Sequence, residues 1–238
     1  MDVGVGEVTR ALLAIARGSG PGRDLAAMIC AACVDGLDVD GAAISLWTAT
    51  QARETLHATD EVAQHLEDLQ FTLGEGACIQ AASTGRPVLV SDMHDVAAAD
   101  QWPIFAAAVV ERTPIRALLA LPMQWGTINL GVLDLYRTTP GMLNGPQLRD
   151  ATSASDTAGL LLLGQQTDPG DGHWLDHSVL RYAVVHQATG MVTAQLGISA
   201  KDAFARLRAH AFAEHRLLHD VAGDVVSRRL RFRRNGDL

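Results

Sequence analysis

The sequence predicts an α+β domain, an antiparallel sheet with flanking helices, followed by a small all-α domain of three helices. Two observations support this fold class. Up to about residue 165, strand-like runs rich in Val, Leu and Ile are interleaved with helical runs, whereas beyond residue 172 only helical periodicity occurs. Between them, Gln165–Gly172 places Pro169 and two glycines among polar residues, which is typical of a break between domains. We therefore expect a first domain at 1–165 (core about 20–165), a linker at 166–172, a helical domain at 173–232 and a basic tail at 233–238.

The elements of the first domain follow from the spacing of its apolar residues. Apolar side chains at three- and four-residue steps predict helices, and runs of Val, Leu and Ile predict strands. The helices are expected at 8–17, 23–34, 60–69, 100–112 and 148–163, and the strands at 41–48, 54–59, 87–91, 116–123 and 128–137. The last two strands are joined around Trp125-Gly126-Thr127, so we expect them to pair antiparallel.

Three helices are predicted in the second domain. The first runs from Leu175 to Leu196, where residues recur in an apolar stripe at three- and four-residue steps, and Gly197 ends it. The stripe consists of Leu175, Val179, Tyr182, Val185, Thr189, Val192 and Leu196. Ser199, followed three residues later by Asp202, begins the second helix in a capping-box-like arrangement. The third helix is expected at about 218–229.

Composition indicates a globular protein. Of the 238 residues, 48% are hydrophobic and 19% are charged. The longest apolar stretches are of strand length and fall short of the roughly 20 residues that span a bilayer. The N-terminus has no basic region followed by an apolar run, and three cysteines do not make a disulfide scaffold. We therefore expect a cytoplasmic protein that does not associate with a membrane.

The net charge of −8 conceals two regions of opposite sign. Residues 172–238 hold ten Lys and Arg against six Asp and Glu, a charge of +4, and the other residues hold nine against twenty-one, a charge of −12. An acidic body joined to a basic region is expected when only one part meets a polyanion such as a nucleic acid. The alternative is that a small helical domain simply carries a few surplus arginines.

Six short motifs follow one another along the first domain. They are Leu73-Gly74-Glu75-Gly76-Ala77-Cys78, Thr84-Gly85-Arg86-Pro87-Val88, Val90-Ser91-Asp92, Trp102-Pro103-Ile104-Phe105, Leu121-Pro122-Met123 and Leu130-Gly131-Val132-Leu133-Asp134-Leu135-Tyr136. Their order and spacing resemble the GAF domain, a fold that senses small molecules. Ala77 departs from the proline that this family usually has, which changes the local backbone.

The resemblance implies a ligand pocket between the sheet and the segment that carries Trp102 and Phe105. The candidate pocket residues are Phe71, Cys78, Trp102, Phe105, Leu119 and Leu121. For each of them the alternative is an ordinary core position, where most buried apolar residues lie. The small-molecule ligand stays open, because the Asn-Lys-Xaa-Phe-type signature of cyclic-nucleotide binding is absent and a covalent bilin would depend on Cys78.

Cys30 and Cys33 have the spacing of a redox or metal motif. They lie inside an Ala-rich helical run and not at a helix N-terminus, where a thiolate would be stabilised, so we expect two small core residues. No second CxxC completes a zinc site, and the chain has no Gly-Xaa-Ser-Xaa-Gly elbow or phosphate-binding loop. Cys78 lacks a convincing resolving partner for sulfoxide reduction. We therefore expect no catalytic residue and no metal site.

Four strings carry a second resemblance. They are Val185-His186-Gln187-Ala188-Thr189-Gly190-Met191-Val192, Leu196-Gly197-Ile198-Ser199, Ala203-Phe204-Ala205-Arg206-Leu207-Arg208-Ala209-His210-Ala211 and Val221-Ala222. They resemble the ANTAR domain, an RNA-binding module of transcription antitermination. The resemblance implies a homodimer that binds paired RNA hairpins in nascent transcripts, under control of the GAF-like domain. The whole chain is similar to GAF–ANTAR regulators of the actinobacterial type.

Five residues are candidates for the RNA surface: Gln187, Thr189, Gly190, Arg206 and Arg208. The glutamine amide could bond a base edge, and the arginines could pair with phosphates or stack on bases. Each has an alternative: the threonine lies on the apolar stripe, the glycine could permit close helix packing, and the arginines could solvate a helix face. Many family members have lysine where Thr189 stands. The alternative function is a sensor whose helical domain binds a protein partner or DNA.

Overall fold

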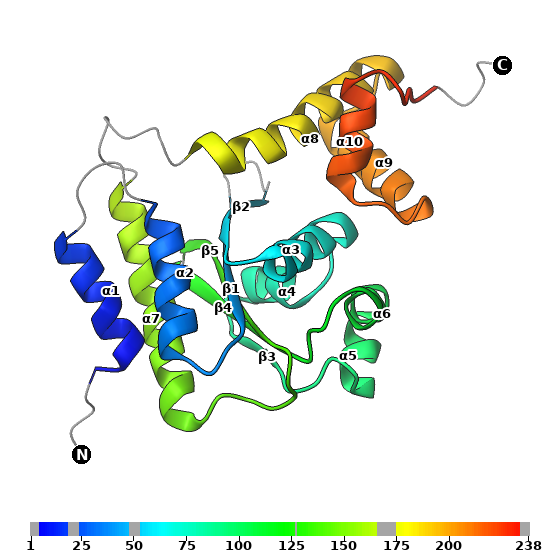
Figure 1. Cartoon of the computed structure of the whole chain (residues 1–238). Coiled ribbons are helices and arrows are strands. Elements are labelled where there is room, and N and C mark those ends of the chain that lie inside the picture. Colours follow the sequence, from blue (N-terminus) through cyan, green and yellow to red (C-terminus); the bar gives the residue numbers. More distant parts are fainter. Residues whose placement is uncertain (1–4, 19–23, 48–52, 127, 166–174, 234–238) are drawn as a thin grey trace.

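The computed structural model describes residues 5–18, 24–47, 53–126, 128–165 and 175–233. The predicted linker at 166–172 and all but the first residue of the predicted tail lie outside these ranges. Figure 1 shows an α+β part built on one sheet and, at one end of it, a group of three helices. The predicted fold class is confirmed.

Five antiparallel strands form the sheet in the order β2-β1-β5-β4-β3. The strands are β1 (Gly41–Trp47), β2 (Arg53–Ala58), β3 (Val88–Val90), β4 (Ala117–Trp125) and β5 (Ile128–Arg137). The long strands β4 and β5 are adjacent in the sheet and antiparallel, with Leu119 opposite Leu135, as the short connection between them predicts.

Helices cover both faces of the sheet (Figure 1). One face packs against α2 (Leu25–Gly36) and α7 (Gly145–Gln165), and α1 (Glu7–Gly18) lies on the outer side of these two helices. The other face packs against α3 (Glu61–Leu73), α4 (Ala77–Thr84), α5 (Val96–Gln101) and α6 (Pro103–Arg112). Successive residues of a strand point to opposite faces, so β4 sends Leu119 and Leu121 into the first core and Leu118 and Ala120 into the second.

Two parts of the first domain differ from the prediction. The segment 100–112 was expected as one helix, but α5 and α6 meet at Trp102, because Pro103 begins α6 and disfavours helical backbone in the residue before it. Helix α4 was not predicted. Its eight residues are too few to display a helical repeat, although a positive-φ glycine precedes it at Gly76 and another follows it at Gly85.

The helical domain consists of α8 (Leu175–Leu196), α9 (Ala200–Ala213) and α10 (Leu218–Val226). Gly197 ends α8 in a left-handed conformation, and the Ser199 hydroxyl caps α9 by accepting a 3.1 Å hydrogen bond from the Asp202 amide. A compact apolar core joins the three helices, with fully buried Val192, Leu207 and Val221 at its centre. Helix α10 ends at Val226, three residues before its predicted end at Arg229.

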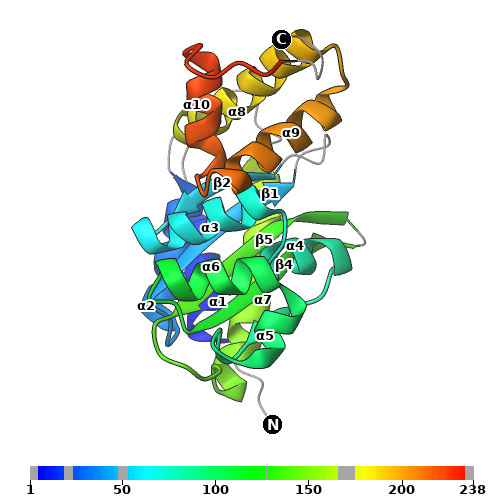
Figure 2. The ribbon, with the colours of Figure 1, turned by 90° about the vertical axis from the view of Figure 1, so that its right-hand side faces the viewer.

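The helical domain rests on the C-terminal end of α3. Figure 2 shows α9 and α10 standing over this helix. Phe71 of α3 packs against the core of the helical domain, and Leu217 packs in the opposite direction against the core that includes α3. Among the described residues, no helix has the length and hydropathy needed to cross a membrane.

Candidate functional site

The solvent-facing side of α8 carries two of the five candidate RNA-surface residues. Gln187 and Gly190 are exposed, as are Ala183 and Ala194, and the steps of three and four residues put all four on one face. A side chain at Gly190 would meet nothing within 4 Å, so close helix packing does not explain this glycine. The face is therefore a strip of small residues from which the amide of Gln187 projects.

Thr189 lies at the edge of the apolar core of the helical domain. It is half-buried, and its hydroxyl donates a 2.7 Å hydrogen bond to the backbone carbonyl of Val185 one turn earlier. This is the packing position that the apolar stripe predicts, with the polar group satisfied inside the helix.

Arg206 and Arg208 point to different flanks of α9. Arg206 is exposed, and no ion pair involves it in the part of the chain that is described. The Nε–H group of Arg208 instead donates a 3.0 Å hydrogen bond to the carbonyl of Thr72, and its Nη2 donates to the carbonyl of Leu73. Burial lowers the pKa of Arg208, although a guanidinium remains charged under all ordinary conditions. The structure therefore separates these two candidates.

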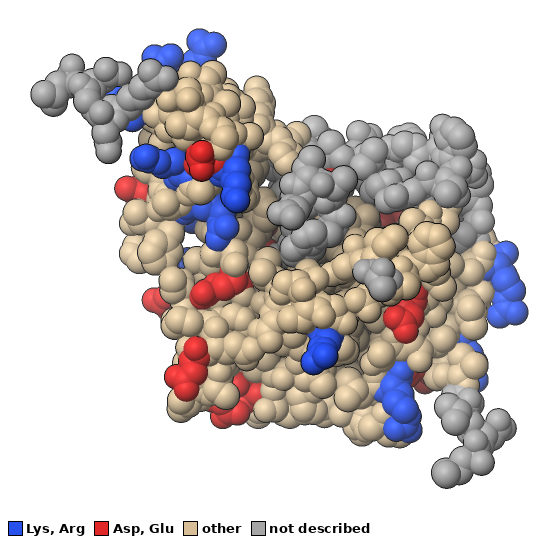
Figure 3. All heavy atoms as spheres, turned by 180° about the vertical axis from the view of Figure 1, so that it is seen from behind, with Lys and Arg blue, Asp and Glu red and all other residues tan. Residues whose placement is uncertain are grey.

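Other arginines of the helical domain divide into paired and exposed ones. Asp224 accepts hydrogen bonds from Arg216 and Arg229, each at 2.7 Å, and these bonds hold the pKa of the Asp224 carboxyl below its usual range. Arg228, Arg231 and Arg233 are exposed. On the face seen in Figure 3, Lys and Arg side chains cluster on the helical domain, whereas single Lys, Arg, Asp and Glu side chains are scattered over the first domain. The basic side chains of the helical domain therefore lie together on this face.

The candidate pocket residues divide into three groups. Cys78, Trp102 and Phe105 are buried in the core between the sheet and α3–α6, and the two rings meet edge to face with centroids 6.1 Å apart. Leu119 and Leu121 lie in the core on the opposite face of the sheet. Phe71 lies against the helical domain, and the centroid of its ring is 5.7 Å from that of the Phe204 ring. Only the first group lies on the side of the sheet where the pocket was predicted, with Trp102 and Phe105.

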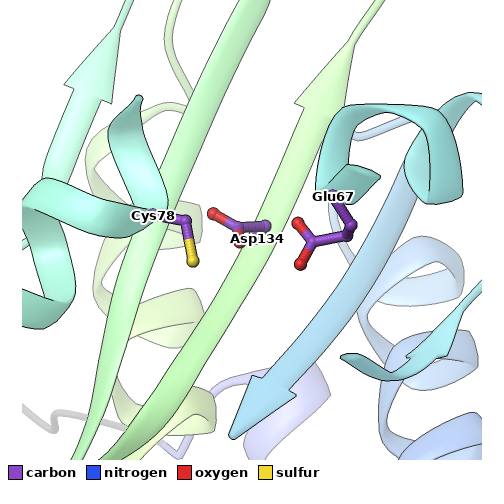
Figure 4. Close-up of side chains that lie close together, drawn as sticks. All are labelled: Glu67, Cys78 and Asp134. Carbon is purple, nitrogen blue, oxygen red and sulfur yellow. The ribbon is translucent and has the colours of Figure 1, made fainter. Parts of the chain in front are cut away.

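Beside this first group lies a buried polar cluster of residues that are far apart in the sequence. Glu67 and Cys78 are fully buried, Asp134 is nearly so, and one ligand atom of each lies within 4.8 Å of the others (Figure 4). Ser45 donates a hydrogen bond to Glu67, and Gln70 links Glu67 to the backbone amide of Cys78.

The sequence of β5 contains a sign of this cluster, because the side chains of a strand alternate between the two faces of the sheet. Alternation puts Asp134 on the same side as Val132 and Tyr136, in an otherwise buried strand. Buried carboxylates are costly unless hydrogen bonds, a proton or a cation compensate them. The two carboxylates and one thiol are therefore the described groups best placed to hold a hydrogen-bond donor or a cation inside the first domain.

Cys30 and Cys33 lie in the core that one face of the sheet forms with α2, α7 and the outer helix α1. Both thiols are free. Burial raises the pKa of Cys33 to about 12 and raises the pKa of Cys30 well above its usual value. An activated redox pair has the opposite shift, so both cysteines act as small core residues, as the helical spacing predicts.

Comparisons with known proteins agree with both resemblances. The GAF domain family model matches residues 22–162, and the ANTAR domain model matches residues 178–226. No curated protein matched the sequence.

Solved structures agree on the fold of the first domain. The GAF domain of an Acinetobacter phosphoenolpyruvate-protein phosphotransferase has a TM-score of 0.53 and 14% identity, over 68% of this chain and 95% of that one. The GAF domain of a phosphoenolpyruvate-protein phosphotransferase from Coxiella burnetii has a TM-score of 0.52 and 10% identity, over 67% and 92%. Identities this low show the fold alone. The family matches themselves establish that the chain belongs to the GAF domain family and carries an ANTAR domain after its GAF domain.

Proposed function

We propose that this protein is a signal-responsive transcription antiterminator, which binds paired RNA hairpins as a homodimer under control of its GAF domain. The observation that supports this proposal is the union of a GAF domain with an ANTAR domain whose helix α8 exposes Gln187 and Gly190 on one face. A regulator that acts on nascent transcripts works in the cytoplasm.

The charge distribution supports RNA as the partner of the ANTAR domain. The basic side chains gather on this domain, while the GAF domain is acidic and would repel a polyanion (Figure 3). Sequence-specific RNA recognition targets unpaired loop bases, which suits an amide projecting from a strip of small residues. The amide of Gln187 then bonds a base edge, Gly190 lets the RNA backbone approach closely, and Arg206 pairs with a phosphate. Thr189 lines the edge of this surface.

The GAF domain supplies the site for the signal. We propose that a small molecule occupies the face that carries Cys78, Trp102 and Phe105, next to the buried carboxylates of Glu67 and Asp134. The carboxylates favour a ligand with hydrogen-bond donors or a positive charge, and the two aromatic rings favour a flat apolar portion.

Crosslinking in the native cells tests this function. Wild-type protein is crosslinked to RNA and the bound RNA is sequenced, in parallel with a Gln187→Ala/Arg206→Ala variant and with an Arg86→Ala variant as a control on the exposed surface of the GAF domain. We expect closely spaced hairpin pairs upstream of terminators, lost with the double variant and kept with the control. Enrichment of DNA or of a protein in place of RNA would contradict the proposal.

A further inference from the structure

The two domains meet through one of the proposed RNA-surface residues. Arg208 of the ANTAR domain is half-buried and donates hydrogen bonds to the carbonyls of Thr72 and Leu73 at the end of α3. Its guanidinium carbon lies 6.0 Å from the centre of the Phe204 ring. In this arrangement the Nε and Nη2 edge of Arg208 is directed to the GAF domain.

The end of α3 is chemically suited to hold a cation. The last carbonyls of a helix have no partner within it, and the helix dipole adds negative potential there. Gly74 ends α3 with φ of +66°, and a side chain at this position would overlap the guanidinium of Arg208. Glycine thus permits both the left-handed turn and the entry of the arginine.

Apolar and backbone contacts surround the hydrogen bonds from Arg208 to the carbonyls of α3. The ring centroids of Phe71 and Phe204 are 5.7 Å apart, and the two rings are tilted relative to each other. The backbone amide of Leu218, at the start of α10, donates a buried 3.1 Å hydrogen bond to the hydroxyl of Thr72. Phe71 and Leu73 therefore contact α9, and Thr72, which lies between them, contacts both α9 and α10.

We propose that this contact is an autoinhibitory latch, in which the C-terminal end of α3 and RNA compete for Arg208. The inference rests on the proposed function. In the docked arrangement the ANTAR domain binds RNA weakly, because the Nε and Nη2 edge of Arg208, which could form a bidentate pair with a phosphate, is held by two carbonyls. Release of α9 from α3 frees Arg208 beside Phe204, where guanidinium and ring can bind an RNA loop together.

Helix α3 also reaches the buried cluster of the GAF domain. Gln70, one residue before Phe71, accepts a 2.7 Å hydrogen bond from the backbone amide of Cys78, and Glu67 lies one turn earlier. A ligand that changes this cluster therefore acts on the same helix that holds Arg208. One rigid element joins the sensing site to the latch, so binding at one end can bias the other.

The test uses the full chain and substitutions confined to the GAF domain, which leave the RNA surface intact. Thr72→Val removes the acceptor for the Leu218 amide with little change of shape, and Phe71→Ala removes the ring contact. Thr84→Val on α4, an exposed threonine away from the latch, is the matched control. Undocking is followed by hydrogen exchange of the first amides of α10, and RNA binding by anisotropy of a labelled synthetic RNA of two hairpins with loop sequences recovered by crosslinking.

We expect faster exchange at α10 and about tenfold tighter RNA binding in both latch variants, with the control unchanged. Saturating RNA should also speed α10 exchange in the wild-type protein, because the coupling is reciprocal. Equal RNA affinity despite faster exchange would overturn the latch alone, and so would wild-type α10 exchange that is already as fast as in the variants. No RNA binding by any variant would overturn the proposed function together with the latch.

Discussion

Arg208 of the ANTAR domain and Thr72 of the GAF domain are joined by a 3.0 Å hydrogen bond, from the Nε–H group of the arginine to the carbonyl of the threonine. The two residues lie 136 positions apart in the sequence. The bond places a cation of the output domain at the C-terminal end of a sensor helix, where helix carbonyls accept hydrogen bonds readily. If Arg208 also binds RNA, as we propose, sensing and RNA binding share one residue, and a change in either is expected to alter the other.

Replacement of Arg206 by alanine should weaken RNA binding about tenfold, since a hydrogen bond to a charged group contributes about 1.5 kcal/mol. Loss of one phosphate contact should also reduce the slope of log affinity against log salt concentration by about one. Anisotropy titrations at several salt concentrations measure both. Arg86→Ala, on the exposed surface of the GAF domain, is the control. An unchanged salt slope in Arg206→Ala would remove this residue from the RNA surface.

Gly74 and Gly126 provide a matched pair for the space that Arg208 occupies. Both have positive φ, +66° and +62°, but a side chain at Gly126 meets nothing within 4 Å, whereas one at Gly74 overlaps the guanidinium. Alanine at either position costs about 1 kcal/mol of backbone strain. Gly74→Ala should lower the urea midpoint further than Gly126→Ala, and this difference should disappear when both glycine variants are compared in an Arg208→Ala background. Equal midpoints for both single variants would contradict this account of Gly74.

The ion pair between Asp92 and Arg116 should appear in acid unfolding. The Arg116 guanidinium donates hydrogen bonds of 2.9 and 2.5 Å to the Asp92 carboxylate, which lowers its pKa from the usual 3.8 to about 2. Because the folded-state pKa is depressed, the pair stabilises the fold above about pH 4, and this contribution is lost as pH falls towards 2. Asp92→Asn should therefore lose less unfolding free energy over this interval than the wild type.

Urea unfolding at a series of pH values measures this difference. Asp100→Asn, at an exposed position on α5, should follow the wild-type curve. If the unfolding free energy of Asp92→Asn fell with pH as steeply as that of the wild type, other carboxylates would account for the acid sensitivity.

The three buried cysteines should resist alkylation in the folded protein. Burial raises the pKa of Cys33 to about 12 and that of Cys30 well above its usual value, so almost no thiolate exists at either position near pH 8. Mass spectrometry after iodoacetamide treatment should find all three unmodified in buffer and all three alkylated in concentrated urea. Rapid alkylation of Cys30 or Cys33 in buffer would argue against their core position.

Short-range patterns were sufficient for most elements and for both families. Apolar spacing predicted the strands and all but the shortest helices, because side chains three or four residues apart share a helix face and alternate residues share a strand face. The same rule puts Leu118 and Leu119 of β4 on opposite faces of the sheet. The predicted pocket nevertheless combined Leu119 and Leu121 with Trp102. They lie on the other face of the sheet.

The sequence by itself determined the two folds, the charge separation and the apolar stripe that holds Thr189. Only the tertiary structure decided which distant residues meet. Glu67 reaches Asp134 because α3 packs over β1 and β2, and β1 is the neighbour of β5 in the sheet. Arg208 reaches Thr72 because the ANTAR domain rests on the end of α3. Periodicity reports the face on which a side chain lies, but not the element that covers this face. That choice depends on packing between segments far apart in the chain, to which a local pattern makes no reference.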